Sequence, residues 1–182
     1  MNRRTFSRTA TATARAEQGI EERGTPVKED ALHIELGRRY LFAASHRLHS
    51  RQLSEEENYR VFGKCNNPYG HGHNYILEVS LSGKIDPATG MIANLADLDA
   101  FVTRHVLEEF DHHSLNEDVP AFSDKVPTTE NLCIEIFHRL QNFPHAKLER
   151  VRIQETGNNS FEYAGKRRKT TRDQANRRDP AE

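Results

Sequence analysis

The segment between Lys64 and Tyr75 constrains this chain more than any other stretch of its 182 residues. It holds the thiol of Cys65 and the imidazoles of His71 and His73, separated by glycine and proline residues. If a strand begins at His71, both imidazoles point to the same face, because side chains alternate along a strand. Two imidazoles on one face can then reach a single metal ion.

A third histidine, His46, follows another alternating apolar run. Three imidazoles with an open coordination position are typical of a catalytic zinc site, whereas a structural zinc site is closed by four protein ligands. Cys65 is then either a fourth ligand or an acid or base beside the metal. Iron, copper and nickel also accept three imidazoles, and the alternative to any metal site is a group of hydrogen-bonded polar histidines. The combination of Cys65 with three histidines favours a metal, and we predict zinc.

Composition narrows the class of protein. The length suits one domain with a core of its own, and a net charge of -1 calls for neither nucleic acid nor an anionic membrane as partner. Cys65 and Cys133 are too few for a disulfide framework, so we expect a reducing cytoplasm. No apolar run approaches the roughly 20 residues of a membrane span.

The chain divides into three parts. Residues 1–30 are rich in Arg, Thr, Ala and Glu without apolar periodicity, and we predict a disordered tail. Residues 166–182 are predicted to be a second disordered tail, which is charged. Residues 31–165 carry regular apolar patterns and are predicted to form the one folded domain, which contains the candidate site.

Apolar spacing predicts two helices and four strands in this domain. One helix is capped by Asn94 and ends near Phe110, and the other begins at Thr128 or Thr129. Alternation indicates the strands, which cover residues 32–45, 75–82, 149–154 and 161–164. The order ββααββ is typical of an α+β fold with two helices on one face of a four-stranded antiparallel sheet. The open edges of so small a sheet favour an oligomer.

Structural predictions also follow for the segment before Lys64 and for Leu148. The polar residues 47–63 are predicted to form a loop, in which Ser54 can start a short helix. Leu148 has the wrong parity for the apolar face of the third strand, so we assign it to the preceding turn.

The Asp111-His112-His113 triplet follows the first helix. A carboxylate beside a histidine can orient the imidazole and raise its basicity, as in sites where a third group orients a catalytic base. The alternative is a polar helix end, where histidine is favourable near the negative end of the helix dipole. Next to a metal site and a thiol, the first interpretation is preferred.

Glu155 continues the parity of Val151 and Ile153, so it is predicted to leave its strand on the apolar face. A carboxylate in a pocket can accept two parallel hydrogen bonds from a guanidine-like edge, such as that of a pterin or guanine. The alternative is an ordinary exposed strand end, and spacing alone does not choose between the two.

These motifs, in this order, resemble the 6-pyruvoyl-tetrahydropterin synthase family over about Leu32 to Gly165. The resemblance is carried by residues 44–50, 54–58, 62–68, 70–75, 85–91, 94–98, 111–112, 128–131 and 155–156 with Asn159. It implies the tunnelling fold, assembled as a homohexamer from two trimers, with active sites at subunit interfaces.

The resemblance also implies an activity. A zinc-dependent carbon–oxygen lyase of this family converts 7,8-dihydroneopterin triphosphate to 6-pyruvoyl-tetrahydropterin and triphosphate, in tetrahydrobiopterin-type pterin biosynthesis. By resemblance, the zinc ligands are His46, His71 and His73, the catalytic residues are Cys65, Asp111 and His112, and the pterin is bound by Glu155, Thr128 and Thr129.

Two alternatives stay open. The related 6-carboxy-5,6,7,8-tetrahydropterin synthase of the queuosine pathway uses the same substrate, and the run from Asp111 to Asn116 leans toward it. The longer spacing between Cys65 and His71 favours the pyruvoyl-forming enzymes instead. The other alternative is a pterin- or purine-binding oligomer without catalysis, in which zinc is structural.

Overall fold

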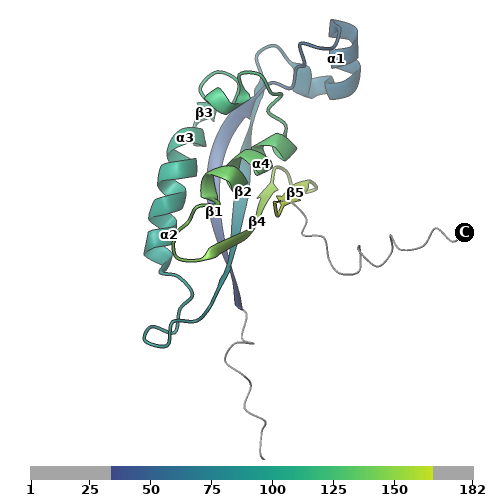
Figure 1. Cartoon of the computed structure of the whole chain (residues 1–182). Helices are drawn as coiled ribbons and strands as arrows, with labels where there is room; N and C mark the ends of the chain where they lie inside the picture. The colour runs from purple at the N-terminus through teal and green to yellow at the C-terminus, as the bar shows by residue number, and fades with distance from the viewer. Residues whose placement is uncertain (1–33, 166–182) are drawn as a thin grey trace, which may run out of the picture.

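The computed structural model describes residues 34–165. The two predicted tails, residues 1–30 and 166–182, lie outside the described residues. Within them the elements follow one another in the order shown in Figure 1: β1 (Ile34–His46), α1 (Glu55–Phe62), η2 (Gly63–Asn66), β2 (His71–Gly83), α2 (Leu95–Val102), η3 (Thr103–Leu107), α3 (Glu108–Phe110), β3 (His113–Ser114), η4 (Pro120–Phe122), α4 (Thr129–Leu140), β4 (Lys147–Gln154) and β5 (Ser160–Tyr163).

The sheet has five strands in the order β3-β1-β2-β4-β5. The four predicted strands are present and pair antiparallel with one another, but the prediction of a four-stranded, wholly antiparallel sheet was wrong. A fifth strand, β3, pairs parallel with β1, where Ala44 lies opposite His113 and Ser45 opposite Ser114. A strand of two residues carries no periodicity, so the sequence pattern offers no signal for it.

Leu148 belongs to β4 and not to the preceding turn. It lies opposite Leu81, whereas Arg150 lies opposite Ser80, so Glu149 is an extra residue and the strand is bulged there. A bulge shifts the side-chain alternation by one position. Leu148 and Val151 therefore both reach the core face, and both are buried.

The helices cover one face of the sheet, as predicted. Figure 1 shows the α2-η3-α3 run and α4 on the same side of the strands, with α1 beyond one end of the sheet. Asn94 caps α2 by accepting a hydrogen bond from the Ala96 amide at 2.9 Å, and Thr128 caps α4 by accepting from the Asn131 amide at 3.3 Å. Both capping predictions are confirmed in position.

The first helical run contains a π-helical segment, η3, that the sequence analysis did not anticipate. The buried apolar residues of the whole α2-η3-α3 run recur every four positions, at Leu98, Val102, Val106 and Phe110. In a regular α-helix of 3.6 residues per turn, that spacing rotates the last of them roughly 120° away from the first. The wider turn of a π-helix offsets this drift, and all four side chains stay in the core.

The polar segment after β1 contains the short helix α1, which Ser54 caps. The Ser54 hydroxyl accepts from the Glu57 amide, and the Glu57 carboxylate accepts from the Ser54 amide in return. This reciprocal pair is a capping box, and three acidic residues in the first turn suit the positive end of the helix dipole. In residues 34–165, no helix has the length and apolar character that crossing a bilayer requires.

The central position of Val79 gives a test of this core. Val79 is 1% exposed on β2, and Val61 is 58% exposed on α1. We expect Val79→Ala to lower the free energy of unfolding by roughly 2–3 kcal/mol, because buried methyl groups are lost and a cavity remains. Urea unfolding followed by circular dichroism measures the loss. The matched Val61→Ala variant should change it by less than about 0.5 kcal/mol, and equal losses would contradict the placement of Val79.

Candidate metal centre

The register of β1 with β2 brings the three predicted histidines together. His46 lies directly opposite His71, and Ala44 lies opposite His73. Because His71 and His73 are two residues apart on one strand, they share a face, and His46 meets them from the neighbouring strand. One nitrogen from each ring can be chosen so that all three lie within 4.8 Å of one another.

The spacing of these nitrogens fits a metal ion. The Nε2 atoms of His46 and His71 are 3.2 Å apart. In a tetrahedral site with metal–nitrogen distances of about 2.0–2.1 Å, neighbouring ligand nitrogens lie about 3.3–3.4 Å apart. The Nε2 atom of His73 is buried and has no hydrogen-bond partner among the described residues. An unpartnered buried nitrogen is costly, and a metal ligand bond would satisfy it.

The protonation of His46 also suits a metal ligand. Its Nδ1 lies 2.9 Å from the backbone oxygen of Pro127. A carbonyl oxygen can only accept, so Nδ1 carries the proton and donates, and Nε2 of the neutral ring keeps a free lone pair. Proteins commonly hold metal-binding histidines in this way. Burial lowers the pKa of both His46 and His71, which favours the neutral form that binds metal.

Glu155 lies beside the three imidazoles. Its Oε1 atom is 3.9 Å from Nε2 of His46 and 3.8 Å from Nε2 of His73. The same oxygen accepts a 2.6 Å hydrogen bond from the hydroxyl of Thr129. The prediction that Glu155 leaves β4 on the apolar face is confirmed in position, while its binding of a pterin stays a prediction. Thr128, by contrast, uses its hydroxyl to cap α4.

Cys65 lies in η2 and is partly exposed. Its backbone oxygen accepts a 2.8 Å hydrogen bond from the Leu48 amide, which ties η2 to the segment after β1. Within residues 34–165 the group of side chains that could hold a metal ion consists of the three histidines without Cys65. This grouping favours Cys65 as a neighbour of the candidate metal site over Cys65 as a ligand. Burial raises the pKa of the Cys65 thiol, and the charge of Glu155 raises it further.

Asp111 and His112 are held at the outer edge of β1. The Asp111 carboxylate accepts from the Ala43 amide at 2.8 Å and lies 3.0 Å from Nδ1 of His112. The hydrogen bond from the Ala43 amide, with smaller help from His112, holds the pKa of Asp111 below its usual range. The His112 amide donates to the Ala43 carbonyl, which holds His112 at a positive φ of 62°.

His112 is therefore oriented by its own chain and yet exposed. A positive φ is strained for a residue with a side chain, and such strain persists only where the surroundings enforce it. Yet the His112 side chain is 81% exposed. The predicted pairing of Asp111 with His112 is present. The pair lies at the sheet edge, and among the described residues neither side chain is hydrogen-bonded to Cys65.

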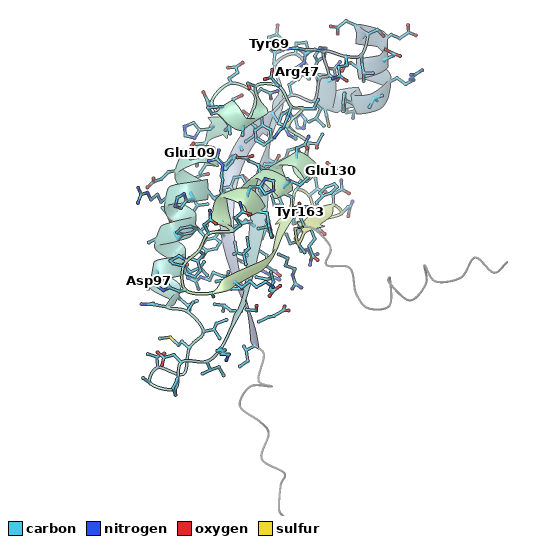
Figure 2. All side chains as sticks on the ribbon, in the orientation of Figure 1. Arg47, Tyr69, Asp97, Glu109, Glu130 and Tyr163 are labelled. Atoms are coloured by element: carbon cyan, nitrogen blue, oxygen red, sulfur yellow. The ribbon has the colours of Figure 1, made fainter. Side chains whose placement is uncertain are left out.

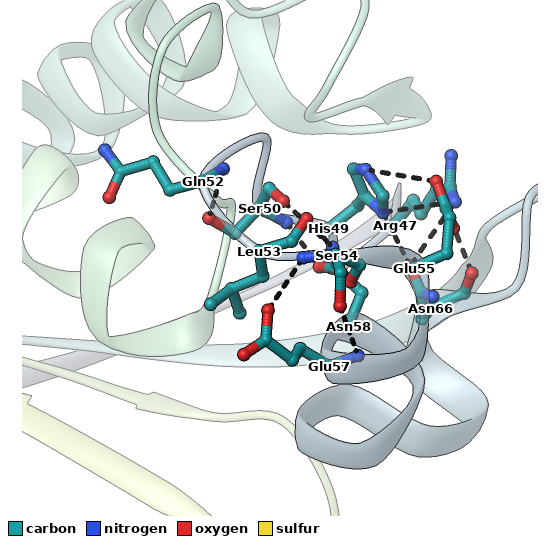
Figure 3. Close-up of polar contacts among 10 residues, drawn as sticks. All are labelled: Arg47, His49, Ser50, Gln52, Leu53, Ser54, Glu55, Glu57, Asn58 and Asn66. Atoms are coloured by element: carbon teal, nitrogen blue, oxygen red, sulfur yellow. Dashed lines mark hydrogen bonds and ion pairs between the residues drawn. The ribbon is translucent and has the colours of Figure 1, made fainter.

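The segments beyond the histidines are held by buried asparagines (Figure 3). Asn58 is fully buried and donates to the carbonyls of Ser50, Leu53 and Ser54, while its own oxygen accepts from the Ser50 amide. Buried polar groups are stable when every hydrogen-bonding atom is used in this way. The sequence analysis missed Asn58; its position in a helix with few apolar residues gave the only available signal.

Asn66 holds the guanidinium of Arg47, through its backbone oxygen and its side-chain oxygen, both at 3.3 Å. Asn116 fixes the Arg47 backbone, accepting from the amide at 2.7 Å and donating to the carbonyl at 3.0 Å. Figure 2 shows Arg47 and Tyr69 at the end of the molecule that carries α1. The tight turn after Tyr69 requires Gly70, because its φ is +66° and a Cβ there would lie 2.9 Å from the His46 carbonyl oxygen.

A cavity of about 630 Å³ adjoins His46 on this side. Its lining includes three cationic side chains and two carboxylates, from Arg47, Arg51, Lys125, Glu117 and Asp124. Hydroxyl groups of neighbouring serines complete a polar surface. The cavity can accept a charged ligand group that extends away from the histidines.

Comparison with known proteins agrees with this arrangement. The sequence model for 6-pyruvoyl tetrahydropterin synthase matches residues 35–166. The human 6-pyruvoyl tetrahydrobiopterin synthase is 50% identical over 132 residues, which cover 72% of this chain and 91% of the relative. The structure of Caenorhabditis elegans 6-pyruvoyl tetrahydropterin synthase superposes with a TM-score of 0.71 at 42% identity, over 74% of this chain and 97% of that one.

A putative 6-carboxy-5,6,7,8-tetrahydropterin synthase of Archaeoglobus fulgidus is also similar. It is 39% identical over 85 residues, which cover 47% of this chain and 67% of that protein. The fold and the three-histidine cluster define an α+β protein with three histidines that can hold a metal ion and a carboxylate beside them. The chain belongs to the 6-pyruvoyl tetrahydropterin synthase family.

Removal of one imidazole tests the metal centre. We expect His71→Ala to weaken metal binding by at least about 100-fold. Loss of a residue that only orients a metal ligand already lowers metal affinity about 10–100-fold, and loss of a ligand should cost more. Metal content after dialysis against dilute zinc, measured by mass spectrometry, reports the loss. His145→Ala removes an exposed histidine elsewhere and serves as the control. Equal metal content in both variants would rule out His71 as a ligand.

Proposed function

We propose that this protein is a zinc-dependent lyase that converts 7,8-dihydroneopterin triphosphate to 6-pyruvoyl-tetrahydropterin and triphosphate. The observation that carries the proposal is the three-histidine cluster with Glu155 and its Thr129 hydrogen bond alongside, in a chain half identical to a 6-pyruvoyl tetrahydrobiopterin synthase. We place the activity in tetrahydrobiopterin-type pterin biosynthesis in the cytoplasm, with no nucleic acid or membrane partner.

The metal would be held by His46, His71 and His73. When bound, zinc supplies a Lewis acid that lowers the pKa of a substrate hydroxyl and polarises a developing carbonyl. Glu155 would accept two hydrogen bonds from the amino and ring N–H groups of the pterin, with Thr129 holding the carboxylate in place. Thr128, which caps α4 beside Thr129, would line the pterin pocket. The substrate side chain would then extend past the histidines.

The reaction moves protons between carbon and oxygen, so it needs a base beside the substrate side chain. Cys65 is our candidate, but burial and Glu155 raise its pKa within one chain. A thiolate forms more readily near positive charge, which the metal ion and a protonated His112 would supply. Asp111 would hold His112 in orientation, as its 3.0 Å contact with Nδ1 suggests.

These roles are easiest to reconcile if two copies of the chain share a site. His112 is 81% exposed at the sheet edge, although Asp111 and Ala43 hold it firmly. A strained and oriented base that faces solvent is well placed to serve a neighbouring subunit. We propose a homohexamer, a dimer of trimers, in which Asp111 and His112 of one subunit approach Cys65 of the next. Pairing of the open β-strand edges would assemble each trimer.

Loss of triphosphate requires cationic neighbours. Arg47, Arg51 and Lys125 line the cavity beside His46. We propose that the triphosphate extends into this cavity. Arg47 is the residue best prepared for this role, because Asn66 and Asn116 fix it through neutral groups and leave its charge uncompensated by those contacts.

Product identification tests the activity. Zinc-loaded protein mixed with 7,8-dihydroneopterin triphosphate should release triphosphate and a 6-pyruvoyl product, both detected by mass spectrometry. A 6-carboxy product with acetaldehyde would assign the protein to the queuosine-type reaction on the same substrate. The shorter match to the Archaeoglobus relative makes that result the less expected one. Binding without turnover would indicate a pterin-binding oligomer in which the metal is structural.

Replacement of the thiol separates catalysis from metal binding. We expect Cys65→Ala to lower kcat by at least about 100-fold, a loss typical of an acid or base group, while metal content stays unchanged. Cys133→Ala, at the buried thiol that donates to the Val151 carbonyl, is the control and should retain activity. Loss of metal in Cys65→Ala would instead make Cys65 a ligand.

Mixed oligomers test the shared site. Cys65→Ala and His112→Ala should each be inactive alone, because each lacks one member of every site. After co-expression, random mixing should restore roughly a quarter of the sites, since a complete site then combines an intact Cys65 with an intact His112 from a neighbour. Steady-state turnover measures the recovery. No recovery, from oligomers shown to contain both variants, would place both residues in the same chain's site.

A further inference from the structure

The carboxylate of Glu155 lies beside the three-histidine cluster without belonging to it. Its Oε1 atom is 3.9 Å from Nε2 of His46 and 3.8 Å from Nε2 of His73. The group of ligand atoms that lie within 4.8 Å of one another consists of one nitrogen each from His46, His71 and His73, without Glu155. Carboxylate oxygens are themselves zinc ligands, so Glu155 has the chemistry of a fourth ligand.

The Oε1 atom of Glu155 lies just outside the position of such a ligand. With metal–ligand distances of about 2.0–2.2 Å, neighbouring ligand atoms of a tetrahedral zinc site are about 3.3–3.5 Å apart. The distances from Oε1 to His46 and His73 are both longer than this. A small rotation of the Glu155 side chain would fill the open position, and a zinc site closed by four protein ligands is typical of a structural site.

Thr129 holds this same oxygen. Its hydroxyl donates a 2.6 Å hydrogen bond to Oε1 of Glu155. Thr129 is 3% exposed and is the first residue of α4, so the helix fixes its backbone. Its β-branched side chain is restricted in χ1, which limits the positions that the hydroxyl can take. The hydrogen bond therefore ties Oε1 to a rigid part of the structure.

The backbone on both sides of this hydrogen bond is anchored. Thr128, next to Thr129, caps α4 by accepting from the Asn131 amide at 3.3 Å. The Glu155 amide donates to the Asn159 carbonyl at 3.1 Å, across the turn that follows β4. The carboxylate is thus held in place by contacts that do not involve the histidines.

We infer that Thr129 is a positioning residue that keeps Glu155 out of the coordination shell of the metal. A carboxylate beside a divalent cation is attracted to it by opposite charge, so an open position next to Glu155 needs a restraint. The Thr129 hydroxyl supplies that restraint at the oxygen nearest to two of the histidines. The inference rests on the proposed function, because the substrate hydroxyls would bind at the open position.

Loss of the Thr129 hydroxyl should let Glu155 close the site. Valine has nearly the shape of threonine but no proton to donate. The Glu155 side chain is only 15% exposed, and a charge that is largely buried without a partner is costly. Coordination of the metal would satisfy it. We therefore expect Thr129→Val to bind Co²⁺ at least about tenfold more tightly than the wild type, a change of the size that residues around metal ligands produce.

Cobalt(II) is the probe, with affinity measured by competition with a chelator and geometry followed by visible absorption. Azide, a small anion, reports whether a coordination position is open. It should change the visible spectrum of the wild-type Co²⁺ protein and leave that of Thr129→Val unchanged. Thr129→Ser retains a hydroxyl and should behave as the wild type. Thr129→Ala, which also lacks the hydroxyl, replaces Thr129→Val if that variant does not fold.

Replacement of Glu155 separates the restraint from other effects of the change at Thr129. The gain in Co²⁺ affinity should vanish when Thr129→Val is combined with Glu155→Gln, because the neutral amide is a poor ligand. Glu130→Gln removes an exposed carboxylate from the next position of α4 and is the matched control. It should leave both the Co²⁺ affinity and the azide response unchanged.

Three results would overturn the restraint. Thr129→Val could bind Co²⁺ no more tightly than the wild type, its spectrum could respond to azide as the wild-type spectrum does, or the gain in affinity could persist with Glu155→Gln. A wild-type protein that binds no Co²⁺ would overturn the restraint together with the metal centre. Failure of the proposed reaction looks different: the Co²⁺ and azide results would stand, while the triphosphate substrate would not be converted.

Discussion

The pairing of β1 with β2 is the constraint on which the rest of the site depends. Only one register places His46 opposite His71 while Ala44 lies opposite His73. A shift by one residue would turn the imidazoles of one strand to the opposite face, because side chains alternate. The register is secured by the buried side chains further along the same strands, such as Phe42 against Tyr75 and Leu77, which belong to the common core. The same strand register is therefore needed both for packing of the core and for the arrangement of the three histidines.

Around this pair of strands, each further part of the candidate site comes from a different segment and is held by a specific contact. The carbonyl of Pro127, just before α4, sets the tautomer of His46. Thr129, at the start of the same helix, holds Glu155 at the end of β4. The helix that covers the core, with the residue just before it, thus also orders a histidine of the candidate metal site and a carboxylate. Asp111 and His112 differ, because β1 holds them at its edge while His112 stays exposed. The candidate site combines three histidines gathered within one chain with the Asp111–His112 pair, whose imidazole that chain leaves exposed.

Much of the fold and of the site could be predicted from the sequence. Parity placed His71 with His73, and Glu155 with Val151 and Ile153, because a strand repeats every two residues. Capping residues located both helix starts. The errors share a physical origin: each involves a departure from regular periodicity. The bulge at Glu149 changes parity within β4, the π-helical segment changes the helical repeat, and β3 is too short to have a repeat. A pattern-based argument assumes regular geometry and fails where the backbone is locally irregular.

By itself, the sequence determined which residues share a strand face, where helices begin, and which side chains have the chemistry of a metal centre, since these follow from local spacing and residue type. Only the tertiary structure decided which segments meet. It brought His46 against His71, directed the Pro127 carbonyl at His46, and left His112 exposed. Such contacts join residues far apart in the chain, and they depend on how the sheet and helices pack as a whole. Local spacing does not contain that information.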